Sequence, residues 1–248
     1  MLKKILEQID AKQDAIRSYR PFEDAGLLRQ LQSFYRVGIV YSSNALEGYT
    51  YTLSETKILL EDGLTAGGKS MRDALAVLGH AKAYDHMFSL LRSDVITEND
   101  VLTMHSMLGE SLYNDAVVGQ YRNQAAFISG SRYTLTPYDE IPLAMENLFA
   151  RIAQKRDAVH PLLLAAQFHK ELVFIHPFAD GNGRVARLAM NTLLIQKGFL
   201  PVVIPPILRH DYIASLEKAH QNDNDFIRLI AQCELETQKE MLRLLHHK

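Results

Sequence analysis

The sequence predicts a mainly α-helical protein with one β-hairpin and an N-terminal helical extension. Apolar residues recur at helical spacing through most of the chain, and only residues 119–142 combine glycine and serine turn residues with short β-prone runs. Strands that alternate with helices are not indicated. With 248 residues, 47% of them hydrophobic, the chain can bury a sizeable core as one domain, or as one domain with a helical extension.

The composition limits which partners the protein is expected to bind and which cellular compartment it is expected to occupy. The net charge is −2, from 27 basic and 29 acidic residues, so no broad basic field indicates nucleic acid or a membrane surface as a partner. No apolar run approaches the length of a membrane span, and residues 1–16 are amphipathic, unlike a signal peptide. The single cysteine, Cys233, excludes an internal disulfide, fits a reducing cytoplasm and is expected to be structural.

The chain is expected to form a series of helices, whose limits are predicted from helical periodicity, capping residues and helix breakers. Pro21 separates the first two helices, Ser54 is the expected N-cap of a later one, and Thr97 with Asp100 resembles a capping box. Three prolines within residues 199–208 predict an extended connector. The expected helices are residues 1–20, 24–41, a short stretch ending at Gly48, 54–63, 71–91, one starting after Thr97, 139–154, 161–175, 184–197, 212–219 and 225–247.

The hairpin is expected at about residues 125–136, where two β-prone runs flank a turn of small residues. An exposed hairpin edge can take an extended peptide by strand addition, which aligns a side chain without reading much of the peptide sequence. The alternative is a hairpin that faces solvent without a partner. In the first case the peptide would contact Ile128, Ser129, Gly130 and Ser131.

Two other patterns are expected to be structural. Residues 63–70, GLTAGGKS, match the phosphate-binding pattern GxxxxGK(S/T), which makes a P-loop enzyme the rival hypothesis. A P-loop follows a buried hydrophobic strand, whereas the segment before this one is charged and helical in period, so we expect a surface loop. His80, His86 and His105 lie on predicted helices without metal-ligand spacing, and are also expected to be structural.

Residues 176–187, HPFADGNGRVAR, are the candidate active site. The apolar helix before them must end ahead of Pro177, which leaves His176 at a helix C-terminus. The Gly-Asn-Gly turn leaves backbone N–H groups uncovered at the start of the next helix, where anions bind. Arg184 and Arg187 lie one turn apart and could grip neighbouring phosphates, while Asp180 could hold Mg²⁺ between them. A helix-turn-helix corner with a capping histidine is the alternative.

This stretch resembles the signature of the Fic family, HxFx(D/E)GN(G/K)RxxR, and matches it at every specified position. The resemblance implies a helical core with a β-hairpin flap, and transfer of AMP from ATP to a hydroxyl side chain of a protein. Mg²⁺ is the implied cofactor and ATP the implied co-substrate. The implied roles are general base for His176, loop anchor for Phe178, magnesium ligand for Asp180, phosphate nest for Gly181, Asn182 and Gly183, triphosphate clamps for Arg184 and Arg187, and an adenine neighbour for Tyr212.

A second resemblance lies N-terminal to this site. Residues 43–48, SNALEG, match the family's inhibitory motif (S/T)xxxE(G/N), which here includes Ser43 and Glu47. A carboxylate at a helix C-terminus is locally unfavourable, so Glu47 is expected to have a partner elsewhere. The resemblance implies that Glu47 pairs with Arg187 and blocks productive seating of the γ-phosphate.

The sequence therefore predicts a protein adenylyltransferase that Glu47 inhibits. Two alternatives stay open: removal of AMP from a modified protein, with Glu47 positioning a hydrolytic water, and a nucleotide sensor without turnover. Residues 1–95 are expected to form an N-terminal helical region with the inhibitory motif at 42–48, and residues 96–248 the Fic core. The expected partners are ATP and a target protein that docks on the flap, and a homo-oligomer is compatible with the sequence.

Overall fold

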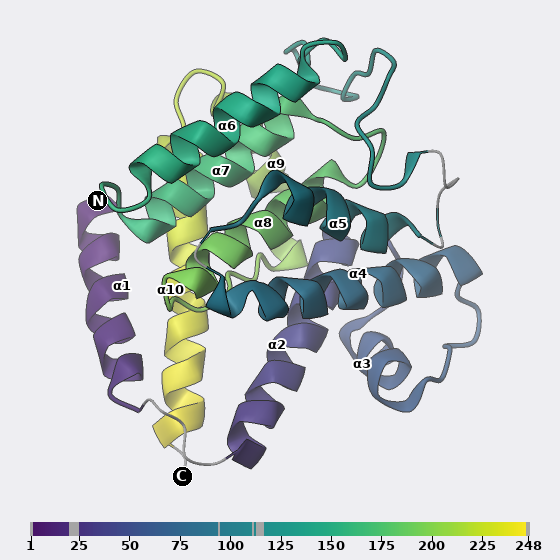
Figure 1. Ribbon diagram of the computed structural model, residues 1–248. Coiled ribbons are helices and arrows are strands. Elements are labelled where there is room, and N and C mark those ends of the chain that lie inside the picture. Colours follow the sequence, from purple (N-terminus) through teal and green to yellow (C-terminus); the bar gives the residue numbers. More distant parts are fainter. Residues whose placement is uncertain (1, 20–24, 94, 111, 113–116, 247–248) are drawn as a thin grey trace.

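Helix α8 (Asn182–Gln196) lies at the centre of the computed structural model, which describes residues 2–19, 25–93, 95–110, 112 and 117–246. Nearly all residues of α8 are buried. Helices α7, α4, α5 and α2 pack around it, as Figure 1 shows. Because the candidate loop at residues 176–187 runs into the first turns of α8, this packing fixes the loop relative to the core.

The mainly helical fold predicted from the sequence is confirmed. The extended connector is also present, since residues 197–205 contain no helix. Among the described residues, no helix is both long and apolar enough to cross a membrane. The remaining elements are α1 (Leu2–Arg17), α2 (Ala25–Leu46), α3 (Leu53–Asp62), α4 (Met71–Ser89), η1 (Leu90–Arg92), α5 (Glu98–Gly109), α6 (Ile141–Lys155), α7 (Pro161–Ile175), η3 (Pro206–Leu208), α9 (Arg209–Lys218) and α10 (Asn224–His246).

Capping residues determine where several helices begin. The expected capping box of α5 is formed, because Thr97 and Asp100 each accept the backbone N–H of the other. Helix α3 begins earlier than predicted: its N-cap is Thr52 and not Ser54, and Thr52 forms a capping box with Glu55. Helix α2 continues to Leu46, so the short stretch predicted before Gly48 is the end of one long helix.

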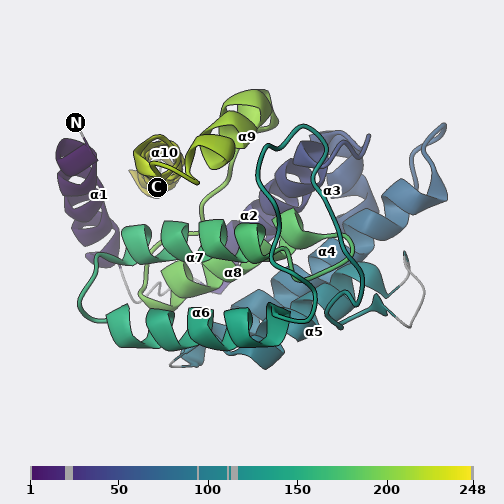
Figure 2. The ribbon, with the colours of Figure 1, turned by 90° about the horizontal axis from the view of Figure 1, so that it is seen from above.

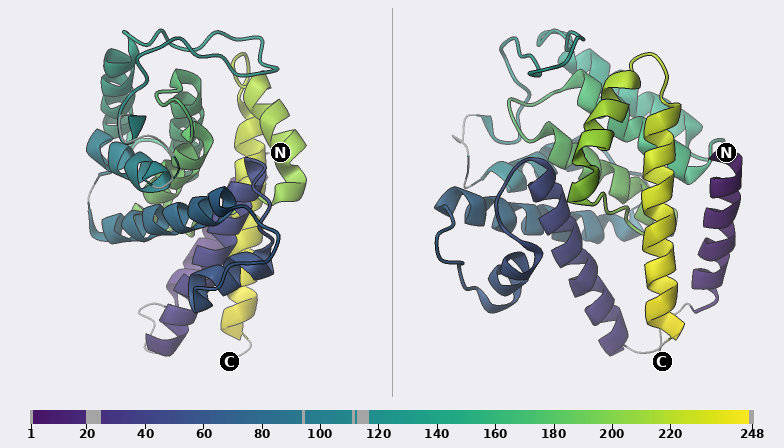
Figure 3. Two further views of the ribbon diagram at one scale, coloured as in Figure 1. Left: turned by 90° about the vertical axis from the view of Figure 1, so that its right-hand side faces the viewer. Right: turned by 180° about the vertical axis from the view of Figure 1, so that it is seen from behind.

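Helix α1 packs along α10, the last helix of the chain, as Figures 1 and 3 show. Ile9 and Ile16 are completely buried. Gln13, which is also buried, donates a hydrogen bond to the carbonyl of Gly198 and accepts one from Gln238 at 3.3 Å. The two ends of the chain therefore support each other beside the end of α8.

The flap does not form a β-hairpin, and the prediction of strands at residues 125–136 is wrong. Residues 117–140 contain no strand; they form a long loop that doubles back near α9 (Figure 2). The turn is where the sequence placed it, with the N–H of Ser131 donating to the carbonyl of Ile128 at 3.1 Å. Side chains take backbone groups that a hairpin would pair: Glu217 accepts the N–H of Arg132 at 2.8 Å, and Arg122 binds the carbonyl of Thr136.

Residues 63–70 form a surface loop between α3 and α4, as expected. Helix α3 precedes this loop, and not the strand that a P-loop requires. Lys69 Nζ binds the carbonyl of Thr50 at 2.5 Å and lies 3.2 Å from the Glu55 carboxylate. Ser70 is the N-cap of α4. The P-loop hypothesis is therefore excluded, since its lysine and serine serve local structure.

Candidate active site

His176 occupies a strained position directly after α7. Its backbone is left-handed, with φ 53° and ψ 58°, and it is the only non-glycine residue with positive φ among the described residues. The N–H of His176 donates to the carbonyl of Leu172 at 3.0 Å, and Pro177 prevents the helix from continuing. Left-handed geometry costs a side-chain-bearing residue about 1 kcal/mol or more, so the surrounding contacts must hold it in place.

The imidazole of His176 has a defined orientation. Its Nδ1 lies 3.3 Å from the carbonyl of Val173, so in the neutral ring Nδ1 carries the proton and Nε2 has the free lone pair. Burial lowers the pKa of His176 below its ordinary value. At neutral pH the ring is therefore neutral and can accept a proton at Nε2.

Three side chains hold the loop that follows His176. Asn182 accepts the N–H of Phe178 at 2.9 Å and donates to its carbonyl at 2.8 Å. Phe178 is completely buried, and its ring stacks on His105 at 3.8 Å. His105 Nδ1 accepts the N–H of Gly119 at 2.9 Å, so Nε2 carries the proton and donates to the carbonyl of Asp180 at 3.1 Å. Burial lowers the pKa of His105 to about 4, which keeps this bridging ring neutral.

Arg122 joins the flap to the same loop. Its Nε donates to the carbonyl of His176 at 2.9 Å, and its Nη1 donates to the carbonyl of Gln124 at 2.8 Å. Its backbone N–H donates to the carbonyl of Pro177 at 2.8 Å. With the contact to Thr136, one guanidinium connects both ends of the flap to the backbone of the candidate catalytic residue.

Helix α8 has its first turn beside the Glu47 carboxylate. Gly181 is its N-cap with φ 81°, and no side chain caps the helix. The N–H of Gly181 donates to Asp180 Oδ1 at 2.6 Å and is therefore already used. The first N–H groups of a helix have no partner within the helix, and here they belong to Asn182 and Gly183. Arg184 is 1% exposed, and its guanidinium lies 5.2 Å from the centre of the Tyr49 ring. The Asp180 carboxylate approaches Arg184 Nη2 at 4.0 Å.

Asp180 has an exposed carboxylate just before the start of α8. Its side chain is 55% exposed. In the described part of the chain, no group of three or more histidine, cysteine, aspartate or glutamate side chains could hold a metal ion. Mg²⁺ usually binds through one or two carboxylates, substrate phosphates and water, so a single carboxylate beside a phosphate site fits that ion.

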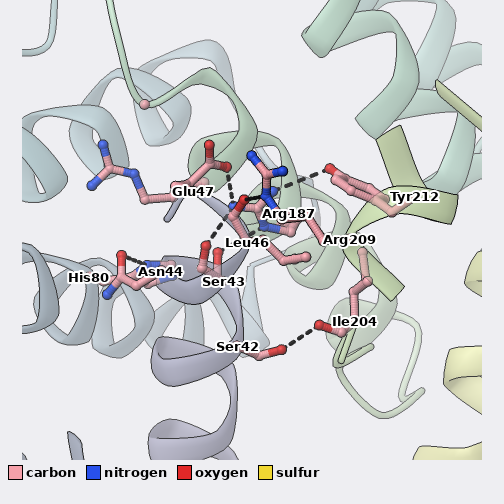
Figure 4. A network of polar contacts seen from close by, with 12 residues as sticks. Ser42, Ser43, Asn44, Leu46, Glu47, His80, Arg187, Ile204, Arg209 and Tyr212 are labelled. Carbon is pink, nitrogen blue, oxygen red and sulfur yellow. Dashed lines mark hydrogen bonds and ion pairs between the residues drawn. The ribbon is translucent and has the colours of Figure 1, made fainter. Parts of the chain in front are cut away.

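Glu47 and Arg187 form an ion pair between the end of α2 and α8 (Figure 4). Glu47 Oε1 lies 2.6 Å from Arg187 Nη2, and the Glu47 side chain is 37% exposed while that of Arg187 is 6% exposed. Ser43 accepts hydrogen bonds from Arg187 Nε through its hydroxyl at 2.8 Å and from Nη2 through its carbonyl at 2.9 Å. Ser43 and Glu47 therefore both accept hydrogen bonds from the Arg187 guanidinium.

Further contacts fix the end of α2. Ser42 donates to the carbonyl of Ile204, and Asn44 lies 3.3 Å from Nδ1 of His80. Arg209 Nε donates to the carbonyl of Leu46 at 2.7 Å and so caps the helix (Figure 4). The end of α2 is thus held from the connector, from α4 and from α9.

Two hollows meet at Glu47. The first has a volume of about 310 Å³ and brings His176, Gly183 and Arg187 together with the flap and α9. The second, of about 270 Å³, lies next to Asp180, Arg184 and Tyr49. Glu47 lines both. Other residues around the first hollow include Ile128, Ser129, Ser131, Tyr133, Tyr212 and Glu217.

Sequence reasoning missed three residues of this region. His105 was expected to have only an ordinary structural role, and Arg122 and His169 were not among the predicted site residues. Each acts through partners far away in the chain: His105 contacts Asp180, Arg122 contacts His176, and Nε2 of the completely buried His169 lies 2.9 Å from the Tyr212 hydroxyl. For the two histidines the only local signal was their place among apolar helix residues, and Arg122, which lies in the flap loop, had no such signal.

The fold and the site together define a known class. Residues 95–194 match the model of the Fic/DOC family, and that segment includes the whole loop at residues 176–187. The chain therefore belongs to the Fic/DOC family. The matched segment does not include Glu47, which reaches the site from outside it.

The relatives match almost the whole chain. A protein adenylyltransferase Fic from Nematostella vectensis is 36% identical over 242 residues, which are 93% of this chain and 54% of that protein. The chain spans about half the length of the curated relatives it matches. Among solved structures, a fragment of Fic-1 from C. elegans is similar with a TM-score of 0.88 and 27% identity, over 99% of this chain and 73% of that one. A Fic domain-containing signaling protein from Bacteroides thetaiotaomicron has a TM-score of 0.83 and 25% identity, over 95% of each chain.

Proposed function

We propose that this chain transfers AMP from ATP to a hydroxyl side chain of a target protein. The observation that carries the proposal is one cavity of about 310 Å³ shared by His176 at the end of α7 and by Gly183 and Arg187 at the start of α8. A proton acceptor beside an anion-binding helix start is what hydroxyl attack on a phosphate requires. The names of the curated relatives, protein adenylyltransferases, support this reaction class.

In the proposed reaction, the target hydroxyl oxygen forms a bond to the α-phosphorus of ATP. The bond from that phosphorus to the bridging oxygen breaks, so AMP stays on the target and pyrophosphate leaves. Nε2 of His176 takes the hydroxyl proton, because Nδ1 faces the Val173 carbonyl and already carries a proton. The lowered pKa of the buried ring keeps it neutral and competent at neutral pH.

The start of α8 holds the phosphates in this proposal. The backbone N–H groups of Asn182 and Gly183, together with the positive end of the helix, stabilise charge on the phosphate oxygens. Gly181 provides the left-handed turn that exposes them. Arg184 and Arg187 add two guanidinium groups. Phe178 anchors the loop in the core, and Tyr212 belongs to the ATP site as a cavity-lining residue.

Asp180 would hold Mg²⁺ against the phosphates. When bound there, the ion neutralises phosphate charge and aligns the leaving group. The contact between Asp180 Oδ1 and the N–H of Gly181 orients the carboxylate. ATP is the proposed co-substrate, and Mg²⁺ is the proposed cofactor.

The flap is the proposed docking site for the target protein. Ile128, Ser129 and Ser131 line the cavity, and Gly130 forms the turn between them with φ 85°. Phe127 beside them is 90% exposed. Without strands, the loop would hold the target through backbone groups near its turn and through this exposed apolar side chain, with the hydroxyl directed at His176.

Glu47 is the proposed inhibitor. Its carboxylate occupies Arg187 and lies against Gly183, so a triphosphate cannot place its γ-phosphate on the same guanidinium. Ser43 holds the guanidinium in the paired position. We accordingly propose an N-terminal region, residues 1–95, that regulates a catalytic core at residues 96–248.

Removal of AMP is a second candidate function. Glu47 and His176 line the same cavity, and the Glu47 side chain is 37% exposed, so a water molecule bound by this carboxylate could attack an AMP–protein bond. The same residue would then inhibit transfer and assist removal.

Labelled ATP separates the two functions. We expect Glu47→Gly to incorporate label from α-labelled ATP into protein, and Glu47→Gly combined with His176→Ala to incorporate none. The wild-type chain mixed with a pre-labelled target tests removal: release of AMP that Glu47→Gly abolishes would support it. No incorporation by Glu47→Gly into any protein of a lysate, or into itself, would refute transfer.

A further inference from the structure

Arg187 makes four hydrogen bonds through its guanidinium, and three of them go to one segment. Ser43 accepts two and Glu47 one, and both residues lie at the end of α2 (Figure 4). The fourth goes from Nη1 to the hydroxyl of Tyr212 on α9, at 3.3 Å. Among the described residues, Tyr212 is therefore the one hydrogen-bond partner of this guanidinium that does not belong to the segment carrying Glu47.

The Tyr212 hydroxyl has a second partner on the side away from Arg187. His169 is completely buried on α7, and its Nε2 lies 2.9 Å from the hydroxyl oxygen. A guanidinium only donates, so the hydroxyl accepts from Arg187 and directs its own proton to His169. Burial lowers the pKa of His169 to about 3, which keeps Nε2 available as the acceptor. The order of donation is therefore Arg187 to Tyr212 to His169.

We propose that Tyr212 and His169 are positioning residues that keep the Arg187 guanidinium directed into the cavity once Glu47 has released it. The inference rests on the proposed transfer of AMP, in which Arg187 must release Glu47 and then bind the γ-phosphate. An arginine has several freely rotating bonds, and a side chain that is already held loses less entropy on binding. Helices α7 and α9 do not carry the inhibitory motif, so this anchor remains when the pairing with α2 is lost.

The test compares affinities for ATP and ADP, because only ATP has a γ-phosphate. In a Glu47→Gly background, we expect Tyr212→Phe to weaken ATP binding several-fold while ADP binding changes little. In a Ser43→Ala/Glu47→Gly background, which removes two side-chain partners at the end of α2, the same substitution should cost roughly 10-fold or more in ATP affinity. Calorimetry with both nucleotides measures these effects, and thermal melting confirms that each variant is folded.

Two further variants separate positioning from simple packing. His169→Gln keeps an acceptor for the Tyr212 hydroxyl and should retain ATP affinity, whereas His169→Phe fills the space without an acceptor and should lose it. Tyr84→Phe is the matched control, because Tyr84 is also buried, on α4, and its hydroxyl donates to the carbonyl of Gln32 and not to a partner of Arg187; it should leave the ratio of ATP affinity to ADP affinity unchanged. Equal losses for ATP and ADP in Tyr212→Phe, or no loss in the Ser43→Ala background, would overturn the proposal.

The same variants distinguish failure of the proposed AMP transfer from failure of the proposed positioning of Arg187. If Glu47→Gly binds ATP more tightly than ADP but transfers no AMP, the reaction is refuted while the positioning of Arg187 is still measured by the affinity ratio. If Glu47→Gly binds neither nucleotide, both proposals are wrong.

Discussion

A Cβ atom on Gly183 would lie 2.5 Å from Oε1 of Glu47. Carbon atoms do not approach carboxylate oxygens so closely, so with any side chain at position 183 the Glu47 carboxylate would have to shift from its present contact with Arg187. The Glu47 carboxylate therefore occupies space directly above the backbone that is proposed to receive the phosphates. In the proposed mode of binding, Glu47 and a triphosphate would compete for the same volume as well as for the same guanidinium.

Glu47→Gly is expected to increase AMP transfer on the order of 10- to 100-fold. The pair joins a buried guanidinium to a carboxylate that is 37% exposed, so water screens part of its strength. Incorporation of label from α-labelled ATP measures the effect. Glu47→Gln is the matched control, since it keeps the shape and removes the charge; it should give an intermediate rate. A rate for Glu47→Gly equal to wild type, at equal folding by circular dichroism, would show that Glu47 does not inhibit.

His176→Ala in the Glu47→Gly background is expected to lower AMP transfer by about 10²- to 10⁴-fold while ATP affinity changes little. In the proposed reaction, the imidazole accepts the proton of the target hydroxyl, whereas the start of α8 binds the phosphates. Single-turnover rates and calorimetry measure the two quantities. A loss of affinity that exceeds the loss of rate would instead assign His176 to nucleotide binding.

The pH dependence of transfer should reflect the buried position of His176. Only the neutral ring accepts a proton, and burial lowers its pKa below the ordinary value of 6.5. Activity should therefore persist to lower pH than for an exposed histidine, and the acid-side midpoint of kcat/KM in Glu47→Gly should lie below 6.5. A midpoint at or above that value would contradict the burial of the catalytic ring.

Asp180→Ala should remove both transfer and the magnesium dependence of ATP binding. Without this carboxylate, the triphosphate loses the protein ligand for its cation. Titration of ATP with and without MgCl₂ measures the dependence, and Asp62→Ala, at an exposed position at the end of α3, is the control. Unchanged magnesium dependence would place the ion on another residue.

Glu234 should make the protein less stable as the pH rises. This carboxyl is completely buried on α10, and burial raises its pKa from 4.5 to about 8. Between these values the unfolded chain has lost the proton and the folded chain retains it, so the free energy of unfolding falls by about 1.4 kcal/mol per pH unit. Below pH 4.5 the contribution is fully present, and it is lost as the pH passes 8.

Glu234→Gln tests this assignment, because glutamine keeps the shape and has no proton to lose. Denaturant unfolding between pH 5 and 8 should show a flatter dependence for Glu234→Gln than for wild type. Glu236→Gln, whose side chain is 67% exposed on the same helix, should follow wild type. Identical slopes for wild type and Glu234→Gln would show that the carboxyl is hydrated.

Local signals in the sequence were sufficient for the helices. Apolar periodicity and helix breakers predicted each α-helix. Thr97 with Asp100 predicted where α5 begins. Ser54 was the wrong choice because two capping residues stand close together, and Thr52 alone has a glutamate three residues later. Such competition between neighbouring caps depends on small energy differences.

The flap and the supporting side chains depend on distant contacts. Residues 125–136 have strand-forming composition, yet Glu217 and Arg122 bind backbone groups that cross-strand pairing would use. The ring of His169 and the Tyr212 hydroxyl meet because α7 and α9 come together in the fold. No pattern within a short window indicates such pairs. The loop at residues 176–187 was readable because its residues are consecutive.

Arg122 holds the two ends of the flap in fixed positions relative to His176. One side chain binds the carbonyls of Gln124 and Thr136, at the two ends of the flap, and the carbonyl of His176. Because these ends are fixed by a single residue, the segment between them can be exchanged, lengthened or shortened without moving the imidazole. We expect that the flap sequence between these two ends can be replaced while the position of His176 stays the same. New target preferences could then evolve, or be engineered, by changes in the flap alone.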